Sequence, residues 1–226
     1  MVENIAPVLQ VNQLRTRFKT RTGDVHAVNT VSFDLRPGEL LGVVGESGSG
    51  KSVTMMSLLG LLPEGAQVSG SIRFDGEELV GRTEQDLCRL RGNRIGMIFQ
   101  EPMTSLNPVI TCGKQVMECL VKHKRISETD ARLKTIELFE LVELPDPAGM
   151  VSRYPHQLSG GQKQRVMIAM AMCCQPQLLI ADEPTTALDV TLQQQILQLL
   201  QTLRAKHGLS VLLISHDLSL VRRFAD

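Results

Sequence analysis

The chain has 226 residues, a length that suits one large domain or one domain with a sizeable insertion. Its 24 Lys and Arg residues balance its 24 Asp and Glu residues, and aromatic residues make up only 3%. A neutral chain lacks the positive field with which nucleic-acid-binding proteins neutralise phosphates, and few aromatic side chains are present for base stacking. We therefore expect no nucleic-acid partner.

No stretch of the sequence has the pattern of a signal peptide or of a membrane span. The densest apolar runs, such as residues 40–44, are four or five residues long, whereas a bilayer span needs about 20. The five cysteines are odd in number and show no C-x-x-C spacing. These features predict a chain with reduced thiols in the cytosol.

The predicted elements begin with two strands over residues 8–14 and 28–35, where apolar and polar residues alternate as in half-buried antiparallel strands. Residues 40–44 form a continuous apolar run, which predicts a buried central strand. A glycine-rich turn then leads into a helix over residues 51–61. Because short strands continue to alternate with helices, the sequence predicts an α/β fold.

The middle of the chain differs from the rest. Between residues 107 and 150 the periodicity is helical and no strand pattern occurs, with an expected helix cap at Ser127. We interpret residues 107–150 as a helical insertion into a core made of residues 1–106 and 151–226. Further strands are expected over 69–75, 95–99, 178–182 and 211–215, and further helices from 159, over 190–206 and from 217.

The first chemical motif follows the buried strand and satisfies G-x-x-x-x-G-K-[ST], the pattern of a phosphate-binding loop. Its residues are Gly45, Glu46, Ser47, Gly48, Ser49, Gly50, Lys51 and Ser52. In such a loop the backbone N–H groups point at phosphate oxygens, the lysine reaches the β- and γ-phosphates, and the last hydroxyl ligates Mg²⁺. The motif predicts a nucleoside-triphosphate site in a P-loop NTPase fold; the alternative is a glycine-rich turn that binds nothing.

Two carboxylates stand at the end of the apolar run 178–181. We expect Asp182 to hold Mg²⁺, directly or through water, because a metal–phosphate site needs a carboxylate on a neighbouring buried strand. Glu183 is expected to act as the general base that polarises the attacking water. The alternative is that both residues only terminate a strand.

A second glycine-containing motif opens the helix expected from residue 159, and it consists of Leu158, Ser159, Gly160, Gly161 and Gln162. One interpretation is a capping box, in which Ser159 and Gln162 satisfy each other's backbone N–H groups. Capping leaves two consecutive glycines unexplained, since each costs about 1 kcal/mol relative to alanine in a helix interior. We therefore interpret this helix start as a second phosphate-binding site as well.

Together these motifs resemble an ABC-transporter nucleotide-binding subunit over essentially the whole chain. Gln100 after the strand 95–99, and the segments 187–189 and 215–217, stand in the order of that family. The segments 100–108, 154–157 and 181–191 resemble the oligopeptide and dipeptide importer branch, which also includes nickel, glutathione and some sugar importers.

The resemblance implies that ATP and Mg²⁺ are bound in a head-to-tail dimer, with Lys51 and Ser52 of one subunit facing Ser159 and Gly161 of the other. It implies that Gln100 contacts Mg²⁺ or water and reports nucleotide state to a permease helix seated along residues 101–108. His216 would bond the γ-phosphate and orient Glu183. Asp189 would link the two sites, although it is equally a good N-cap for the next helix.

The resemblance also implies partners and a location. These are a second identical or homologous ATPase subunit, two membrane permease subunits, and a periplasmic or extracellular solute-binding protein, at the cytoplasmic face of the inner membrane. Two alternatives are a soluble ABC ATPase that acts on DNA or ribosomes, and an unrelated P-loop kinase or GTPase. The compact segment between residues 100 and 159 and the neutral charge disfavour the first, and the motif at 158–162 disfavours the second.

The sequence departs from the family pattern at two places. The position where many members stack adenine on an aromatic residue corresponds to Thr22, with Phe18 and His26 as the nearest ring-bearing candidates. The chain stops at Asp226, whereas members of the peptide branch continue with a cysteine-bearing tail, so we expect no iron–sulfur cluster. Among the remaining residues, Cys112 and Cys119 are expected in the core, and residues 122–125 form a basic helix end.

Overall fold

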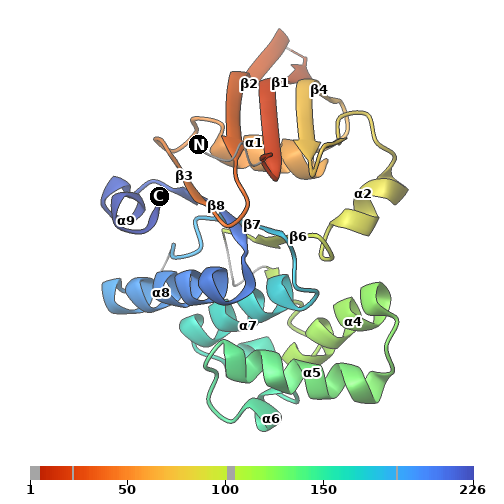
Figure 1. The fold of residues 1–226 in the computed structure, drawn as a ribbon, viewed down its shortest axis with the longest axis vertical. Helices are drawn as coiled ribbons and strands as arrows, with labels where there is room; N and C mark the ends of the chain where they lie inside the picture. Colours follow the sequence, from red (N-terminus) through yellow and green to blue (C-terminus); the bar gives the residue numbers. More distant parts are fainter. Residues whose placement is uncertain (1–5, 22, 101–104, 187) are drawn as a thin grey trace.

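The computed structural model describes residues 6–21, 23–100, 105–186 and 188–226. Figure 1 shows the elements stacked in layers: an antiparallel sheet at the top, helix α1 beneath it, a parallel sheet in the middle, and the remaining large helices below. Sheets and helices alternate through the molecule, as the α/β prediction requires.

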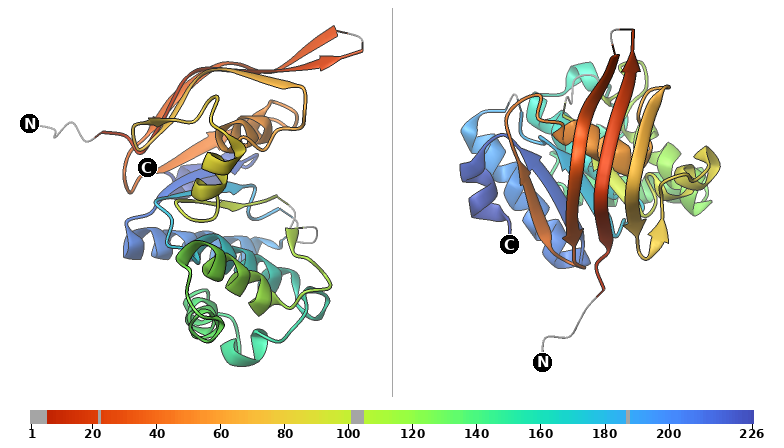
Figure 2. Two further views of the ribbon diagram at one scale, coloured as in Figure 1. Left: turned by 90° about the vertical axis from the view of Figure 1, so that its right-hand side faces the viewer. Right: turned by 90° about the horizontal axis from the view of Figure 1, so that it is seen from above.

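The antiparallel sheet has the strand order β2-β1-β4-β5. Its strands are β1 (Leu9–Thr20), β2 (Gly23–Leu35), β4 (Ala66–Phe74) and the short β5 (Glu77–Glu78). Strands β1 and β2 are longer than the sequence predicts. The prediction missed their paired outer ends because these ends are largely exposed and carry no regular alternation of apolar residues. Figure 2 shows this hairpin extending beyond the rest of the fold.

The parallel sheet has the order β3-β8-β7-β6 and contains the strands β3 (Leu40–Val44), β6 (Ile95–Ile98), β7 (Leu178–Asp182) and β8 (Ser210–Ser215). All residues of β7 and β8 are buried, which explains their continuous apolar runs. The register pairs Val44 with Ser215 and Asp182 with Ile214. The carboxyl ends of β3, β7 and β8 therefore lie along one edge, where α/β sheets bind ligands.

Two hydrophobic cores cover the two faces of this sheet. Leu178 and Ile180 of β7 point into the core shared with α1 and the antiparallel sheet, whereas Leu179 and Ala181 point into the core shared with the lower helices. The lower core also takes in residues of the segment 107–150, such as Phe139. Alternate residues of one strand thus join the upper and lower layers.

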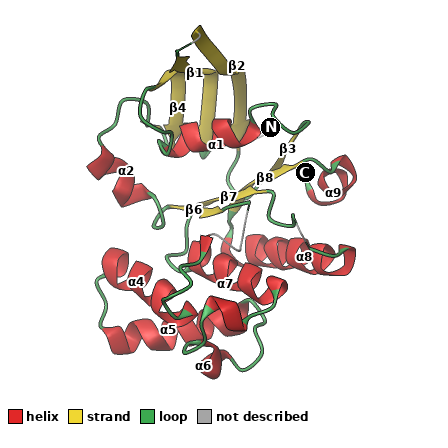
Figure 3. Ribbon diagram, turned by 180° about the vertical axis from the view of Figure 1, so that it is seen from behind, coloured by secondary structure: helices red, strands yellow, loops and turns green. Residues whose placement is uncertain are grey.

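The helices around the parallel sheet are α1 (Lys51–Leu59), α7 (Gly160–Met172), α8 (Val190–His207) and α9 (Leu218–Phe224). The segment 107–150 contains α4 (Cys112–Lys124), α5 (Glu128–Leu141) and α6 (Pro147–Met150), followed by the 3-10 turn η1 (Pro155–Gln157). Figure 3 shows α4, α5 and α6 gathered next to α7. Ser127 caps α5 as predicted, since its hydroxyl accepts a hydrogen bond from Asp130 N at 3.1 Å.

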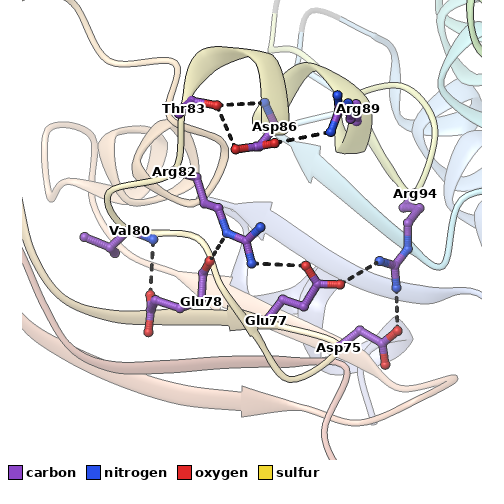
Figure 4. A network of polar contacts seen from close by, with 9 residues as sticks. All are labelled: Asp75, Glu77, Glu78, Val80, Arg82, Thr83, Asp86, Arg89 and Arg94. Atoms are coloured by element: carbon purple, nitrogen blue, oxygen red, sulfur yellow. Dashed lines mark hydrogen bonds and ion pairs between the residues drawn. The ribbon is translucent and has the colours of Figure 1, made fainter.

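Helix α2 (Glu84–Leu90) is absent from the sequence predictions. It begins behind Thr83 and follows a polar network that Figure 4 shows from close by. In this network Arg94, just before β6, pairs with Asp75 and Glu77, and its guanidinium lies 4.9 Å from the centre of the Phe74 ring. Exposed ion pairs contribute about 0–1 kcal/mol, so the network mainly positions the β4–β5 turn against the start of β6.

Within the part of the chain that the structure describes, no helix combines the length and the apolar composition that crossing a membrane would require.

Candidate active site

The phosphate-binding loop connects β3 to α1. Helix α1 begins at Lys51 behind Gly50, which has a left-handed backbone (φ 90°) and gives the helix no side-chain cap. Gly48 has a positive φ of 79° as well. The first N–H groups of a helix have no intrahelical partner, so those of α1 are directed into the loop, where anions bind favourably.

Gly50 is required by packing as well as by its backbone conformation. A Cβ atom at this position would lie 2.3 Å from the carbonyl oxygen of Ala27 on β2. Real Cβ atoms do not approach a backbone oxygen so closely, and left-handed geometry is costly for residues other than glycine. Strand β2 and the loop can therefore pass this close only because residue 50 is glycine.

Lys51 is buried to 9% exposure, and its ammonium group is held inside the loop. The Nζ atom donates hydrogen bonds to the carbonyl oxygens of Gly45 and Glu46, both at 2.7 Å. Two good acceptors offset the cost of burying this charge. The lysine thus places a cation beside the backbone N–H groups, at the position where phosphate charge would need to be neutralised.

Asp182 stands at the end of β7 with only 4% exposure. Burial raises the pKa of this carboxyl, although a hydrogen bond from Ser52 and the charge of Lys51 act in the opposite direction. Among the described residues its Oδ1 atom has no hydrogen-bond partner. An unpaired, buried carboxylate oxygen beside a serine hydroxyl fits the oxygen donor set of Mg²⁺, so the residues present suit the metal that the motif implies.

Glu183 connects the ends of three strands. Its Oε2 atom accepts hydrogen bonds from Thr186 Oγ1 at 2.8 Å and Gln100 Nε2 at 3.2 Å, and lies 3.1 Å from His216 Nδ1. The backbone of Glu183 is left-handed (φ 46°), and its N–H donates to Ile214 O at 3.0 Å. Such conformations cost about 1–3 kcal/mol and concentrate at functional sites. The structure therefore brings the three residues predicted to be catalytic into one cluster.

Thr186 is the member of this cluster that the sequence analysis missed. The only signal for it is a hydroxyl three residues after the carboxylate, which is common at strand ends and carries no specific prediction. Thr186 Oγ1 donates to the Glu183 carboxylate at 2.8 Å, and Thr186 N donates to Glu183 O at 3.1 Å, so the turn after β7 holds both the backbone and the side chain of Glu183.

A cavity of about 660 Å³ opens over the phosphate-binding loop. Residues Ser47 to Thr54, Gln100 and Glu183 line one part, and Val25, His26 and Ala27 of β2 line another. Of the three candidates for adenine stacking, His26 lies in the cavity wall, Phe18 does not line it, and Thr22 lies outside the described residues. Adenine stacking by His26 stays a prediction.

The second glycine motif occupies the start of α7. Ser159 N donates to Gln162 Oε1 at 3.1 Å, and Ser159 Oγ accepts from Gln162 N at 3.3 Å, so the capping box is present. A Cβ atom on Gly161 would lie 2.6 Å from the Leu192 side chain, whereas one on Gly160 would meet only Leu188, at 3.8 Å. Gly161 therefore serves the close packing of α7 on α8, and Gly160 remains exposed.

Ser159, Gly160, Gly161, Gln162 and Asp189 do not line the cavity over the phosphate-binding loop of the same chain. Asp189 caps α8, and its Oδ1 atom accepts from Leu192 N at 2.9 Å. The structure thus separates the predicted site residues into two groups: the loop with Gln100, Asp182, Glu183 and His216, and the starts of α7 and α8.

Comparison with known sequences decides the family, because the ABC transporter family matches residues 28–186. The chain belongs to the ABC transporter family. The peptidoglycan transport ATP-binding protein YejF of Agrobacterium fabrum is 54% identical over 99% of this chain, and the match covers 41% of YejF. The oligopeptide transport ATP-binding protein OppD of Salmonella typhimurium is 49% identical over 97% of this chain, here called the cassette, and the match covers 65% of OppD. The cassette thus spans less than two thirds of either relative.

Solved structures agree with the family assignment. The dimeric, post-hydrolysis structure of the ATP-binding cassette MJ0796 bound to ADP and Pi superposes with a TM-score of 0.85 at 30% identity, covering 96% of this chain and 91% of that one. The α/β P-loop fold with an N-terminal antiparallel region, predicted from the sequence, is confirmed. Residues 101–104, which form part of the expected edge for a permease helix, lie outside the described residues.

Proposed function

We propose that this cassette binds and hydrolyses ATP and that it is the ATPase subunit of an importer. The observation that carries the proposal is the position of the Glu183 carboxylate. Gln100, Thr186 and His216 hold it at the same sheet edge as Lys51 and the unpaired oxygen of Asp182. A positioned carboxylate beside a phosphate-binding loop is the arrangement that activates water for phosphoryl transfer.

Each residue has a separate task in this proposal. The N–H groups at the start of α1 and Lys51 bind the β- and γ-phosphates. Ser52 and Asp182 hold Mg²⁺, with Gln100 next to them; the bound ion neutralises phosphate charge. Glu183 accepts a proton from the attacking water, and His216 bonds the γ-phosphate and keeps Glu183 oriented. A positioned general base contributes about 10²–10⁴-fold to a rate.

The proposed working unit is a head-to-tail dimer. Support comes from the start of α7, where Ser159 and Gly160 are exposed and do not line the cavity of their own chain. We infer that this helix start completes the nucleotide site of a second cassette, identical or homologous, opposite that cassette's phosphate-binding loop. The dimeric MJ0796 cassette is a structural precedent for such an association.

The proposed cargo is a peptide. The names of two relatives support this cargo. OppD of Salmonella typhimurium is named for oligopeptide transport, and DdpD of Escherichia coli for D,D-dipeptide transport. DdpD is 50% identical over 97% of the chain. A peptidoglycan fragment is the second candidate, favoured by the name of the 54% identical YejF. Import of nickel, glutathione or a sugar, and a soluble ABC ATPase without a transport role, rank below these.

The proposed setting is the cytoplasmic face of the plasma membrane, with two permease subunits and an external solute-binding protein as partners.

Phosphate release with ATP and Mg²⁺ tests the ATPase, and release no faster than that of a Glu183→Gln variant would overturn it. Co-purification with membrane partners, followed by uptake of labelled di- and oligopeptides or muropeptides into vesicles, tests the cargo. ATP hydrolysis without any uptake of these solutes would leave the ATPase standing and overturn the cargo.

A further inference from the structure

Three of the five cysteines lie together, away from the phosphate-binding loop. Cys119 belongs to α4, and Cys173 and Cys174 directly follow the last residue of α7. The Sγ atoms of all three lie within 4.8 Å of one another, and those of Cys173 and Cys174 are 3.8 Å apart. Cys173 and Cys174 are buried, and Cys119 is half-buried. Three thiols from two elements far apart in sequence thus meet at one point.

The separations between the sulfur atoms suit a bound metal ion. An ion at the centre of three sulfurs, with metal–sulfur bonds of about 2.3 Å, requires the sulfurs to be about 4 Å apart. The observed 3.8 Å and the limit of 4.8 Å bracket this value, so binding needs side-chain shifts of less than about 1 Å. The three thiols offer sulfur ligands only, which select soft ions.

Nearby cations favour the thiolate form of these ligands. Lys122 acts electrostatically on Cys119, and Lys124 acts on Cys174. One monovalent ion bound by three thiolates has a net charge of −2, which these two lysines balance. The basic helix end at residues 122–125, which ATP hydrolysis does not use, thereby acquires a role.

An entry route leads to the thiols. A cavity of about 630 Å³ lies between α4, α5 and the carboxyl ends of α7 and α8, and Cys173 forms part of its wall together with Lys124 and Met172. A metal site needs such a path as well as its ligands. The thiol nearest to the cavity can therefore receive an ion from solvent and share it with the two behind it.

We propose that Cys119, Cys173 and Cys174 bind one thiophilic monovalent metal ion, of which Cu(I) is the probe, and that this ion joins α4 to the end of α7. On binding, each S–H bond is replaced by a sulfur–metal bond and the proton passes to solvent. No electron is transferred in this step. The site is independent of the nucleotide site, so it stands or falls separately from the proposed ATPase.

The test is an anaerobic titration of the reduced cassette with Cu(I) against a chromogenic Cu(I) chelator. We expect one Cu(I) per chain, and X-ray absorption is expected to show three sulfur neighbours. Loss of one ligand is expected to lower the affinity by at least about 100-fold, because even the loss of a group that only orients a ligand costs about 10–100-fold. The variants Cys174→Ser and Cys119→Ser each remove one ligand. Cys119 is half-buried, so Cys119→Ser keeps the test valid if the substitution of the buried Cys174 unfolds the chain.

Two other cysteines provide matched controls. Cys88 is exposed on α2, and Cys112 lies about two turns from Cys119 on α4, where burial raises the pKa of its thiol to about 11. Cys88→Ser and Cys112→Ser are expected to keep the affinity of the unaltered chain. Absence of tight Cu(I) binding, fewer than three sulfur neighbours, or equal losses in the control variants would overturn the proposal. A rise in the unfolding temperature with Cu(I) that Cys119→Ser abolishes would support it.

Discussion

Helix α1 begins behind a left-handed glycine without a side-chain cap, whereas α7 begins behind Ser159, whose hydroxyl and backbone N–H both pair with Gln162. Both starts contain glycines, and the glycines act differently. Gly50 lets the loop pass the backbone of β2, and Gly161 lets α7 approach Leu192 of α8. The start of α1 leaves its backbone N–H groups free for a ligand, whereas the start of α7 already pairs some of its N–H groups within the capping box.

The two helix starts therefore have different roles in binding a phosphate. A loop with uncapped N–H groups and a lysine inside it forms a phosphate site by itself. A capped, exposed helix start binds an anion weakly alone and becomes useful when a second chain delivers the phosphate to it. We therefore expect changes at α1 to remove nucleotide binding in the isolated chain, and changes at α7 to act on the dimer.

The largest effect is expected from changing the chemistry beside α1. Glu183→Gln removes the general base and a negative charge near the triphosphate, so hydrolysis is expected to fall by about 10²–10⁴-fold while ATP-driven dimerisation strengthens. Lys51→Ala removes the cation of the loop and is expected to abolish dimerisation with ATP. Size-exclusion chromatography with ATP and Mg²⁺, together with phosphate release, measures both. A monomeric Glu183→Gln variant that hydrolyses ATP at the normal rate would disprove the assignment of the base.

Gly50→Ala is expected to have the next largest effect, on both stability and ATP affinity. The new methyl group meets a backbone oxygen at 2.3 Å, and the left-handed conformation adds about 1–2 kcal/mol. Gly48→Ala is the matched control, since its φ of 79° carries the same conformational cost but nothing lies within 4 Å of the new atom. Denaturant unfolding is expected to show Gly50→Ala as the less stable of the two by about 1–3 kcal/mol. Equal stabilities would show that β2 yields and that packing does not fix residue 50.

At α7, the pair Gly161→Ala and Gly160→Ala separates packing from phosphate contact. Gly161→Ala crowds the end of the half-buried Leu192 side chain, which can shift, and is expected to destabilise the fold by about 1 kcal/mol. Gly160→Ala has space and is expected to be neutral or stabilising by about 0.5–1 kcal/mol in unfolding experiments. ATP-driven dimerisation is nevertheless expected to weaken in Gly160→Ala. Full dimerisation of this variant would mean that Gly160 does not approach the nucleotide.

A small loss of stability, about 1 kcal/mol, is expected from Ser159→Ala, which removes the cap of α7. Ser127→Ala removes a matching cap, because Ser127 accepts from Asp130 N at 3.1 Å at the start of α5. Thermal unfolding is expected to show similar losses in the two variants. Only Ser159→Ala is expected to lower ATP-driven dimerisation. If both variants dimerise equally well, Ser159 is a helix cap and nothing more.

The sequence predicted those parts of the site that local patterns encode. The phosphate-binding loop, Asp182 and Glu183 are recognisable because each motif stands directly after an apolar run, and parallel strands bring such positions to one edge. Helix α2 escaped prediction because it is short and only Leu87 on it is buried. The outer halves of β1 and β2 escaped because exposed strands need no alternation.

Contacts between distant segments could not be predicted from the sequence. Gly161 lies against Leu192 of another helix, and the Cys119 thiol meets Cys173 and Cys174 only through the packing of α4 against α7. Neither pair has a signature of spacing, because nothing in a single sequence states which helix faces which. The role of Thr186 at Glu183 is of the same kind, since a hydroxyl near a strand end is ordinary until its partner is known.

Strand β7 forms a wall shared by two apolar compartments, with Ile180 in one and Leu179 in the other. Melting either compartment strips one side of this strand and leaves its hydrogen-bonded neighbours facing water. The two compartments are therefore expected to melt together, in one calorimetric transition. For the same reason, a displacement of Glu183, which directly follows β7, is expected to shift residues of β7 that pack into both compartments. The catalytic carboxylate of Glu183 and the lower helices are thus connected through β7, which ends one residue before Glu183.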